Sequence, residues 1–102
     1  SAGYRIGPGE IEDCLVRHPA GSLAAAIGVP DPLRTEKIKA FIVLRPGHTG
    51  DEDLKKDILN FVNRRLSPHE KPRIMEFVDQ LPMTATGKIK RKDLRDAEIA
   101  RQ

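Results

Sequence analysis

The residues best able to do chemistry lie in one short segment, residues 81–88, near the C-terminal end of the chain. After Leu81 it reads Pro82-Met83-Thr84-Ala85-Thr86-Gly87-Lys88 and has no regular apolar period, which is typical of an exposed loop. Gly87 can adopt backbone conformations that other residues resist, so it can present the amine of Lys88 at the loop tip. Lys88 could then reach an external anion, presented by a loop that includes Pro82, Thr86 and Gly87.

A Gly-Lys pair also occurs in phosphate-binding P-loops, but the rest of that motif is missing. A P-loop needs a glycine about six positions before the lysine and a Ser or Thr after it, where this chain has Pro82 and Ile89. By residue type alone, a lysine in a surface loop is most often a solvated charge. Spacing alone therefore assigns no role to Lys88.

The net charge of +3 comes mostly from a basic cluster near the C-terminal end, formed by Lys88, Lys90, Arg91, Lys92 and Arg95. This cluster suggests a second class of function, a small basic module that binds nucleic acid. Such a module needs base-stacking aromatic side chains or a groove-entering motif, and residues 88–95 contain no aromatic residue. We therefore expect no nucleic-acid partner.

The sequence gives little indication of a metal site, a membrane span or an internal disulfide. His18, His48 and His69 are far apart and lack the spacing of metal ligands, so we assign no metal to this domain. No apolar run is long enough to span a bilayer. The single cysteine, Cys14, is consistent with a reducing compartment, and we expect the cytoplasm or the mitochondrial matrix.

The elements that must position the loop follow from apolar periodicity and turn residues. Helical spacing predicts helices over 8–18, over 51–66 and from about Arg91 onward, and β-branched and apolar runs predict strands over 23–29, 37–44 and 73–78. The acids Glu10, Glu12 and Asp13 are explained by the positive end of the first helix. This order favours one α+β domain over residues 1–102, with a small, largely antiparallel sheet covered by helices.

Two separated motifs carry a family resemblance. Residues 81–95 closely resemble the C-terminal signature of adenylate-forming enzymes, in which Pro, four residues, Gly and Lys are followed by Arg, Leu and Arg. At the other end, Gly3-Tyr4-Arg5-Ile6-Gly7-Pro8 resembles the loop that opens the same domain. The amino-acid sequence of this segment is similar to that of medium-chain and acetyl-type acyl-CoA synthetases. The chain starts at Ser1 and runs straight into this motif, so we expect a longer protein to contain it.

The resemblance implies that the chain is the mobile C-terminal domain of an AMP-forming acyl-CoA synthetase, whose large N-terminal domain lies outside it. Such a ligase activates a carboxylic acid with ATP, releasing pyrophosphate, and transfers the acyl-adenylate to CoA, releasing AMP. Mg²⁺ comes with ATP and is bound mainly by the large domain. Lys88 matches the lysine that stabilises negative charge where the carboxylate attacks the α-phosphate.

The resemblance also implies a second pose, in which the domain rotates and Gly3, Tyr4 and Arg5 line the channel for the pantetheine arm of CoA. Arg34 matches an arginine that contacts the CoA nucleotide. Related enzymes are controlled by acylation, so a lysine acyltransferase and a deacylase acting on Lys88 are further expected partners. An aryl-CoA ligase, or an adenylation domain that loads a carrier protein, would share the same lysine loop. The isolated domain is expected to be inactive.

Overall fold

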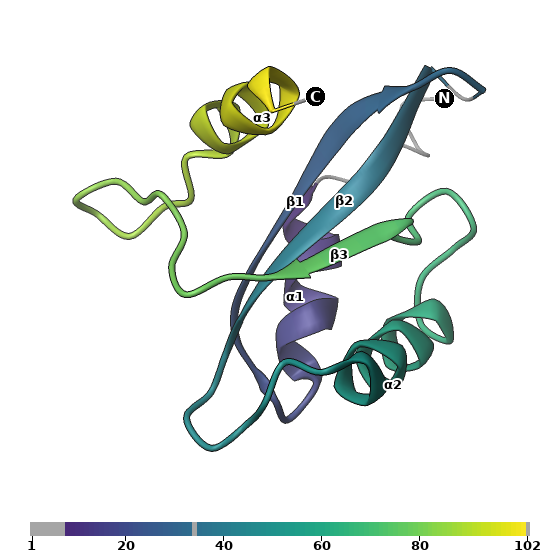
Figure 1. Ribbon diagram of the computed structural model, residues 1–102, viewed down its shortest axis with the longest axis vertical. Helices are drawn as coiled ribbons and strands as arrows, with labels where there is room; N and C mark the ends of the chain where they lie inside the picture. Colours follow the sequence, from purple (N-terminus) through teal and green to yellow (C-terminus); the bar gives the residue numbers. More distant parts are fainter. Residues whose placement is uncertain (1–7, 34, 102) are drawn as a thin grey trace.

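The computed structural model describes residues 8–33 and 35–101, which form a small α+β domain (Figure 1). The elements in chain order are α1 (Pro8–Arg17), β1 (Gly21–Asp31), β2 (Thr35–Leu44), α2 (Glu52–Asn63), β3 (Ile74–Phe77) and α3 (Arg91–Ala100). The predicted fold class, and the predicted order of helices and strands, are confirmed. No helix in this described part of the chain combines the length and the apolar character that crossing a bilayer requires.

The sheet has the strand order β1-β2-β3. β1 and β2 pair antiparallel along most of their length, from Gly21 opposite Leu44 to Asp31 opposite Thr35. β3 pairs parallel to β2 over four residues, from Ile74 opposite Lys39 to Phe77 opposite Ile42. The sheet is thus mixed but largely antiparallel. The parallel pair arises because the connection between β2 and β3 contains α2, a crossover long enough to return the chain to the same end of the sheet.

β1 continues through Pro30 and Asp31, beyond the strand that the sequence predicted over 23–29. Pro30 lies opposite Glu36 in the register, although proline cannot donate a ladder hydrogen bond. The position is tolerated because β1 is an edge strand, and an edge strand needs hydrogen bonds on one side only. The connection to β2 is therefore shorter than the sequence suggested.

Successive side chains along the strands point to opposite faces of the sheet, so the hydrophobic core is divided into two clusters, one on each face. One face packs against α1 and α2 and includes Ala40, Ile42 and Met75. The other face centres on Phe41, with Ala25, Ile27, Val29 and Leu81 buried around it, and Ile89 and Leu94 packed against its edge. Because successive side chains of a strand point to opposite faces, Lys39 and Glu76 share the face of Phe41. That face carries the segment with Lys88 and α3.

Candidate functional site

The segment that carries Lys88 is a hairpin rather than the irregular loop that the sequence predicted. Met83 and Ile89 form an isolated antiparallel bridge. The base of the hairpin is closed by a hydrogen bond from the Lys90 amide to the Pro82 carbonyl (2.9 Å). Its tip is closed by a hydrogen bond from the Thr84 amide to the Lys88 carbonyl (2.7 Å). We call residues 82–90 the lysine hairpin. It extends away from the sheet before the chain enters α3 (Figure 1).

The tip of the lysine hairpin is a tight turn that starts at Thr84. The amide of Gly87 donates to the Thr84 carbonyl (3.0 Å), and Gly87 has a positive φ of 88°, a conformation that non-glycine residues resist. The Thr84 hydroxyl accepts from the Lys88 amide (3.0 Å) and lies 3.1 Å from the Thr86 hydroxyl. Sequence reasoning missed Thr84, although a Thr at the first position of a Gly-containing turn was the available signal.

The side chain of Lys88 is exposed and makes no hydrogen bond or ion pair with any residue that the structure describes. Thr86 and Gly87 beside it are also exposed. A Cβ built on Gly87 would meet no heavy atom within 4 Å, so the tip stands clear of the rest of the domain. The ammonium of Lys88 can therefore reach a group that lies outside the described part of this domain.

Directly after the hairpin, three residues beyond Lys88, an ion pair attaches α3 to α1. Arg91, the first residue of α3, donates from Nε to Oε2 of Glu12 (2.8 Å) and from Nη2 to Oε1 of the same carboxylate. Oε2 of Glu12 also accepts from the Ala26 amide in β1 (2.8 Å). The hydrogen bond to Glu12 raises the pKa of the Arg91 guanidinium. Glu12 thus binds three elements together.

This role corrects the prediction that Glu12 only marks the start of a helix. Glu10 does lie in the first turn of α1, but the side chain of Glu12 is only 9% exposed. In sequence, Glu12 lies between Ile11 and Leu15, at the edge of the apolar face of α1. An acid at the edge of an apolar helical face was the signal for a buried partner.

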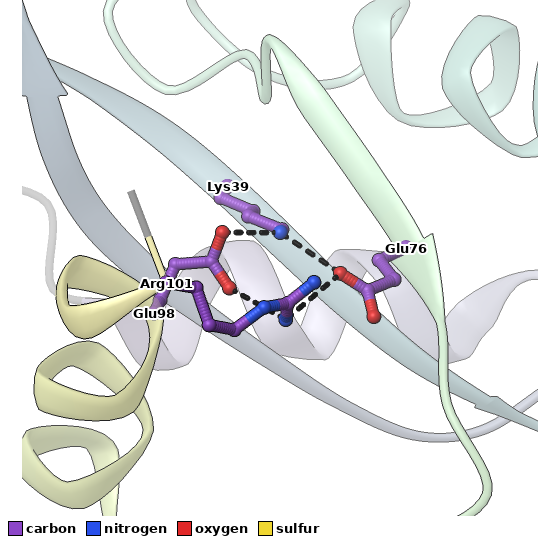
Figure 2. Close-up of polar contacts among 4 residues, drawn as sticks. All are labelled: Lys39, Glu76, Glu98 and Arg101. Carbon is purple, nitrogen blue, oxygen red and sulfur yellow. Dashed lines mark hydrogen bonds and ion pairs between the residues drawn. The ribbon is translucent and has the colours of Figure 1, made fainter.

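A second charged cluster binds the other end of α3 to the sheet (Figure 2). Lys39 Nζ lies 2.6 Å from Glu98 Oε2 and 2.8 Å from Glu76 Oε1. Arg101 bridges the same two acids, at 3.0 Å from Glu98 and 3.8 Å from Glu76. The Lys39 side chain is only 7% exposed, and its ammonium also lies 4.9 Å from the ring centre of Phe41. One residue each from β2, β3 and α3, together with Arg101, the cap residue that follows α3, therefore form one network.

The network shifts the pKa of two of its members. The hydrogen bond from Lys39 lowers the pKa of Glu76 despite its partial burial. Burial alone would lower the pKa of Lys39, but the hydrogen bonds to Glu76 and Glu98 outweigh it and raise that pKa. Both shifts favour the charged forms, so the folded state stabilises the ion pairs across the neutral range.

Acid should therefore weaken the attachment of α3. Because the folded pKa of Glu76 is below its unfolded value of about 4.3, its contribution is complete above that pH and is lost as the pH falls through the folded value. The contribution of Lys39, whose folded pKa is raised, is complete below about pH 10.4 and is lost only as the pH rises through the folded value.

We expect urea denaturation at pH 3 and pH 6 to show a smaller loss of stability on acidification in Glu76→Gln than in the unsubstituted chain. Glu52→Gln is the control, because Glu52 is an acid whose side chain is 77% exposed and lies 3.5 Å from Lys55. An acid response in Glu76→Gln equal to that of the unsubstituted chain would show that Glu76 does not contribute.

The remaining predicted site residues, Gly3, Tyr4, Arg5 and Arg34, lie outside the described residues. Of the histidines, His18 is buried, accepts from the Ala20 amide and bonds to Asp57 in α2. Within residues 8–33 and 35–101 no three His, Cys, Asp or Glu side chains gather as metal ligands would.

Comparison with known proteins agrees with this architecture. Residues 10–88 match the family described as the AMP-binding enzyme C-terminal domain. The chain is 46% identical over 100 residues to the mitochondrial acyl-coenzyme A synthetase ACSM3 of Mus musculus, covering 96% of this chain and 17% of that protein. It is 48% identical over 99 residues to acetyl-coenzyme A synthetase of Bacillus subtilis (strain 168), covering 97% and 17%.

Solved structures give the same result. The crystal structure of an acyl-CoA synthetase from Brucella canis matches with a TM-score of 0.90 at 49% identity, covering 100% of this chain and 19% of that one. A benzoate CoA ligase from Burkholderia xenovorans LB400 matches with a TM-score of 0.81 at 44% identity, covering 90% and 19%. The chain belongs to the AMP-binding enzyme C-terminal domain family, and it spans 17% of the length of the curated relatives above.

Proposed function

We propose that this chain is the C-terminal domain of an AMP-forming acid–thiol ligase, which activates a carboxylic acid with ATP and transfers the acyl group to CoA. The observation that carries the proposal is the exposed amine of Lys88, on an ordered hairpin, in a chain of this family. A large N-terminal domain outside the chain would supply the acid pocket and most contacts to ATP and Mg²⁺. Residues 1–102 alone would then be inactive.

Lys88 would act in the first half-reaction. When a carboxylate oxygen attacks the α-phosphorus and pyrophosphate leaves, negative charge concentrates on the phosphoryl oxygens, and a fixed ammonium lowers the energy of that state where water is excluded. No described residue neutralises Lys88, so its full charge is available to an incoming phosphate. The bonded hairpin limits the positions that the amine must search, which reduces the entropy lost at the transition state.

For the second half-reaction we propose CoA as the acceptor, with Gly3, Tyr4 and Arg5 along its pantetheine arm and Arg34 near its nucleotide. Relatives named acyl- and acetyl-coenzyme A synthetase support CoA over a carrier protein. The acid remains open, because ligases of benzoate and anthranilate are among the similar structures, beside acyl-CoA synthetases. An aryl-CoA ligase is therefore the second candidate.

The nucleic-acid alternative loses support from the ion pairs of α3. Arg91 pairs with Glu12, Lys92 with Asp96 (2.9 Å), and Arg95 with Glu36 (3.5 Å). A phosphate backbone would have to compete with these acids for the basic cluster. Two of these pairs, those of Arg91 and Arg95, attach α3 to the rest of the domain, whereas Lys92 and Asp96 pair within α3.

Pyrophosphate release tests the proposal. The full-length protein that contains this chain should release pyrophosphate from ATP in the presence of one member of a panel of aliphatic and aromatic acids, and should form the matching acyl-CoA when CoA is added. The 102-residue chain should do neither. Failure of the full-length protein with every acid, under conditions where a known acyl-CoA synthetase works, would refute the proposal.

Gly87→Ala should slow adenylation by up to about tenfold, because the new Cβ opposes the positive φ at the tip and moves Lys88. Gly47→Ala is a matched control, because Gly47 has a φ of 93° and equally open surroundings but lies between β2 and α2. Both variants should lose a similar amount of stability, about 1 kcal/mol. Equal adenylation rates in the two variants would show that the tip conformation does not matter.

Acylation of Lys88 by a lysine acyltransferase would remove the same charge and switch off the same half-reaction, and a deacylase would restore it. Intact-mass and peptide analysis of inactive full-length protein checks this, since Lys88 should carry the acyl group in the inactive fraction.

A further inference from the structure

We propose that Glu12 is the positioning residue of the lysine hairpin, acting through Arg91. Few apolar contacts attach α3 to the domain, because none of its ten described residues is buried. Its first turn is held by the pair of hydrogen bonds from Arg91 to the Glu12 carboxylate and by the partly buried Leu94, and the next residue, Arg95, donates to the Gly28 carbonyl (2.8 Å). Lys88 lies only three residues before this contact.

Three features suit Glu12 to this role. Its carboxylate is nearly buried, so the surrounding protein limits its movement. Its Oε2 also accepts from the Ala26 amide, which fixes the carboxylate to the edge strand as well as to α1. The guanidinium of Arg91 meets both carboxylate oxygens at once, and such a two-point contact fixes direction as well as distance.

The path from Glu12 to Lys88 is short and rigid. Arg91 follows Lys90, whose amide closes the base of the hairpin on the Pro82 carbonyl. Ile89 and Leu94 pack against the Phe41 side of the sheet on either side of Arg91. If Arg91 is released, the start of α3 keeps this partly buried apolar contact and the bonds of Arg95 to the Gly28 carbonyl (2.8 Å) and to Glu36 (3.5 Å). The contact nearest to the hairpin is lost, so the tip with Lys88 gains freedom to swing.

The other end of α3 provides a matched control. Glu98, like Glu12, is a nearly buried acid, with an exposed fraction of 11%, and it bonds to basic residues, Lys39 and Arg101. It also contributes to the attachment of α3, but seven residues beyond Arg91 (Figure 2). A general loosening of the helix would therefore follow from either substitution, whereas a positioning effect on Lys88 would follow from a change at Glu12.

Hydrogen exchange in the 102-residue chain tests the positioning directly, without any enzyme assay. In Glu12→Gln, which keeps an acceptor for Ala26, the amides of Thr84 and Lys90 should exchange roughly tenfold faster, because the charged pair that restrains the hairpin base is lost. In Glu98→Gln those amides should stay within about twofold of the unsubstituted chain, with faster exchange confined to the end of α3. Equal exchange at Thr84 and Lys90 in the two variants would overturn the inference.

Arg91→Lys is the second variant, in case a change at the buried Glu12 prevents folding. It leaves Glu12 and its bond to Ala26 intact and keeps the positive charge, but a single ammonium cannot reproduce the planar two-point contact. The same two amides should exchange faster than in Glu98→Gln. If they do not, the geometry of the contact has no positioning role.

The consequence for catalysis rests on the proposed function. In the full-length protein, Glu12→Gln should lower kcat of acyl-adenylate formation by about 10- to 100-fold, since a small displacement of a catalytic group has effects of that size. Its KM for ATP and its rate of thioester formation from supplied acyl-adenylate should change far less. If the unsubstituted protein forms no adenylate, the proposed function fails while the exchange result still decides the role of Glu12. If it does, and both half-reactions slow equally in Glu12→Gln, the positioning role fails.

Discussion

Lys88→Ala in the full-length protein should lower the rate of acyl-adenylate formation by roughly 10²–10³-fold, the effect of removing one preorganised charge-stabilising group. Formation of acyl-CoA from supplied acyl-adenylate should remain close to normal, because in that half-reaction no negative charge develops on a phosphoryl group under attack. Rapid-quench measurement of each half-reaction separately checks both expectations. The fold should be unaffected, since the Lys88 side chain is exposed and contacts no described partner.

Lys90→Ala is the matched control for this experiment. Lys90 is also exposed and basic, lies two residues away, and uses its backbone amide, which alanine retains, to close the hairpin. Its substitution lowers the net charge of the domain by the same amount as Lys88→Ala. Similar losses in the two variants would mean that the enzyme uses the general positive field of the segment, and the assignment of Lys88 would be wrong.

The secondary structure could be predicted because its signals are local. The apolar residues of α2 recur at helical spacing, and Asp51 caps that helix by accepting from the Leu54 amide (2.8 Å). The hairpin of residues 82–90 could not be recognised, because Met83 and Ile89 are too few apolar residues to produce a periodic pattern. The parallel pairing of β3 is also not a local property, since it depends on where the crossover through α2 returns the chain.

The candidate site could be predicted only in part for the same reason. The motif around Lys88 is contiguous, so a resemblance identified it. The partners that hold it are distant in sequence: Glu12 and Arg91 are 79 positions apart, and Lys39 and Glu98 are 59 apart. Each of these four residues taken alone is an ordinary surface charge by its type. The folded chain shows that both acids and Lys39 are nearly buried, and it identifies the residue that each of them bonds to.

Lys39→Met should lower the free energy of unfolding by about 3 kcal/mol, because removing one member of a nearly buried ion pair leaves its partners uncompensated. Glu98, with a side chain only 11% exposed, would keep Arg101 as its remaining basic contact, and Glu76 would keep Arg101 and the more distant charge of Lys55. Two acids would then share one arginine whose side chain is 62% exposed. Urea denaturation near pH 7, followed by circular dichroism, measures this loss.

The double variant Lys39→Met with Glu98→Leu distinguishes charge from packing. Well-packed apolar side chains can replace a buried ion pair at little cost, and Phe41 already provides an apolar neighbour for position 39. We therefore expect the double variant to recover at least half of the stability that Lys39→Met loses, with Arg101 and Glu76 still able to pair. If the double variant is less stable than Lys39→Met, the aliphatic stem of Glu98 contributes more to the attachment of α3 than its charge does. In that case the hold on α3 comes mainly from side-chain packing rather than from the ion network.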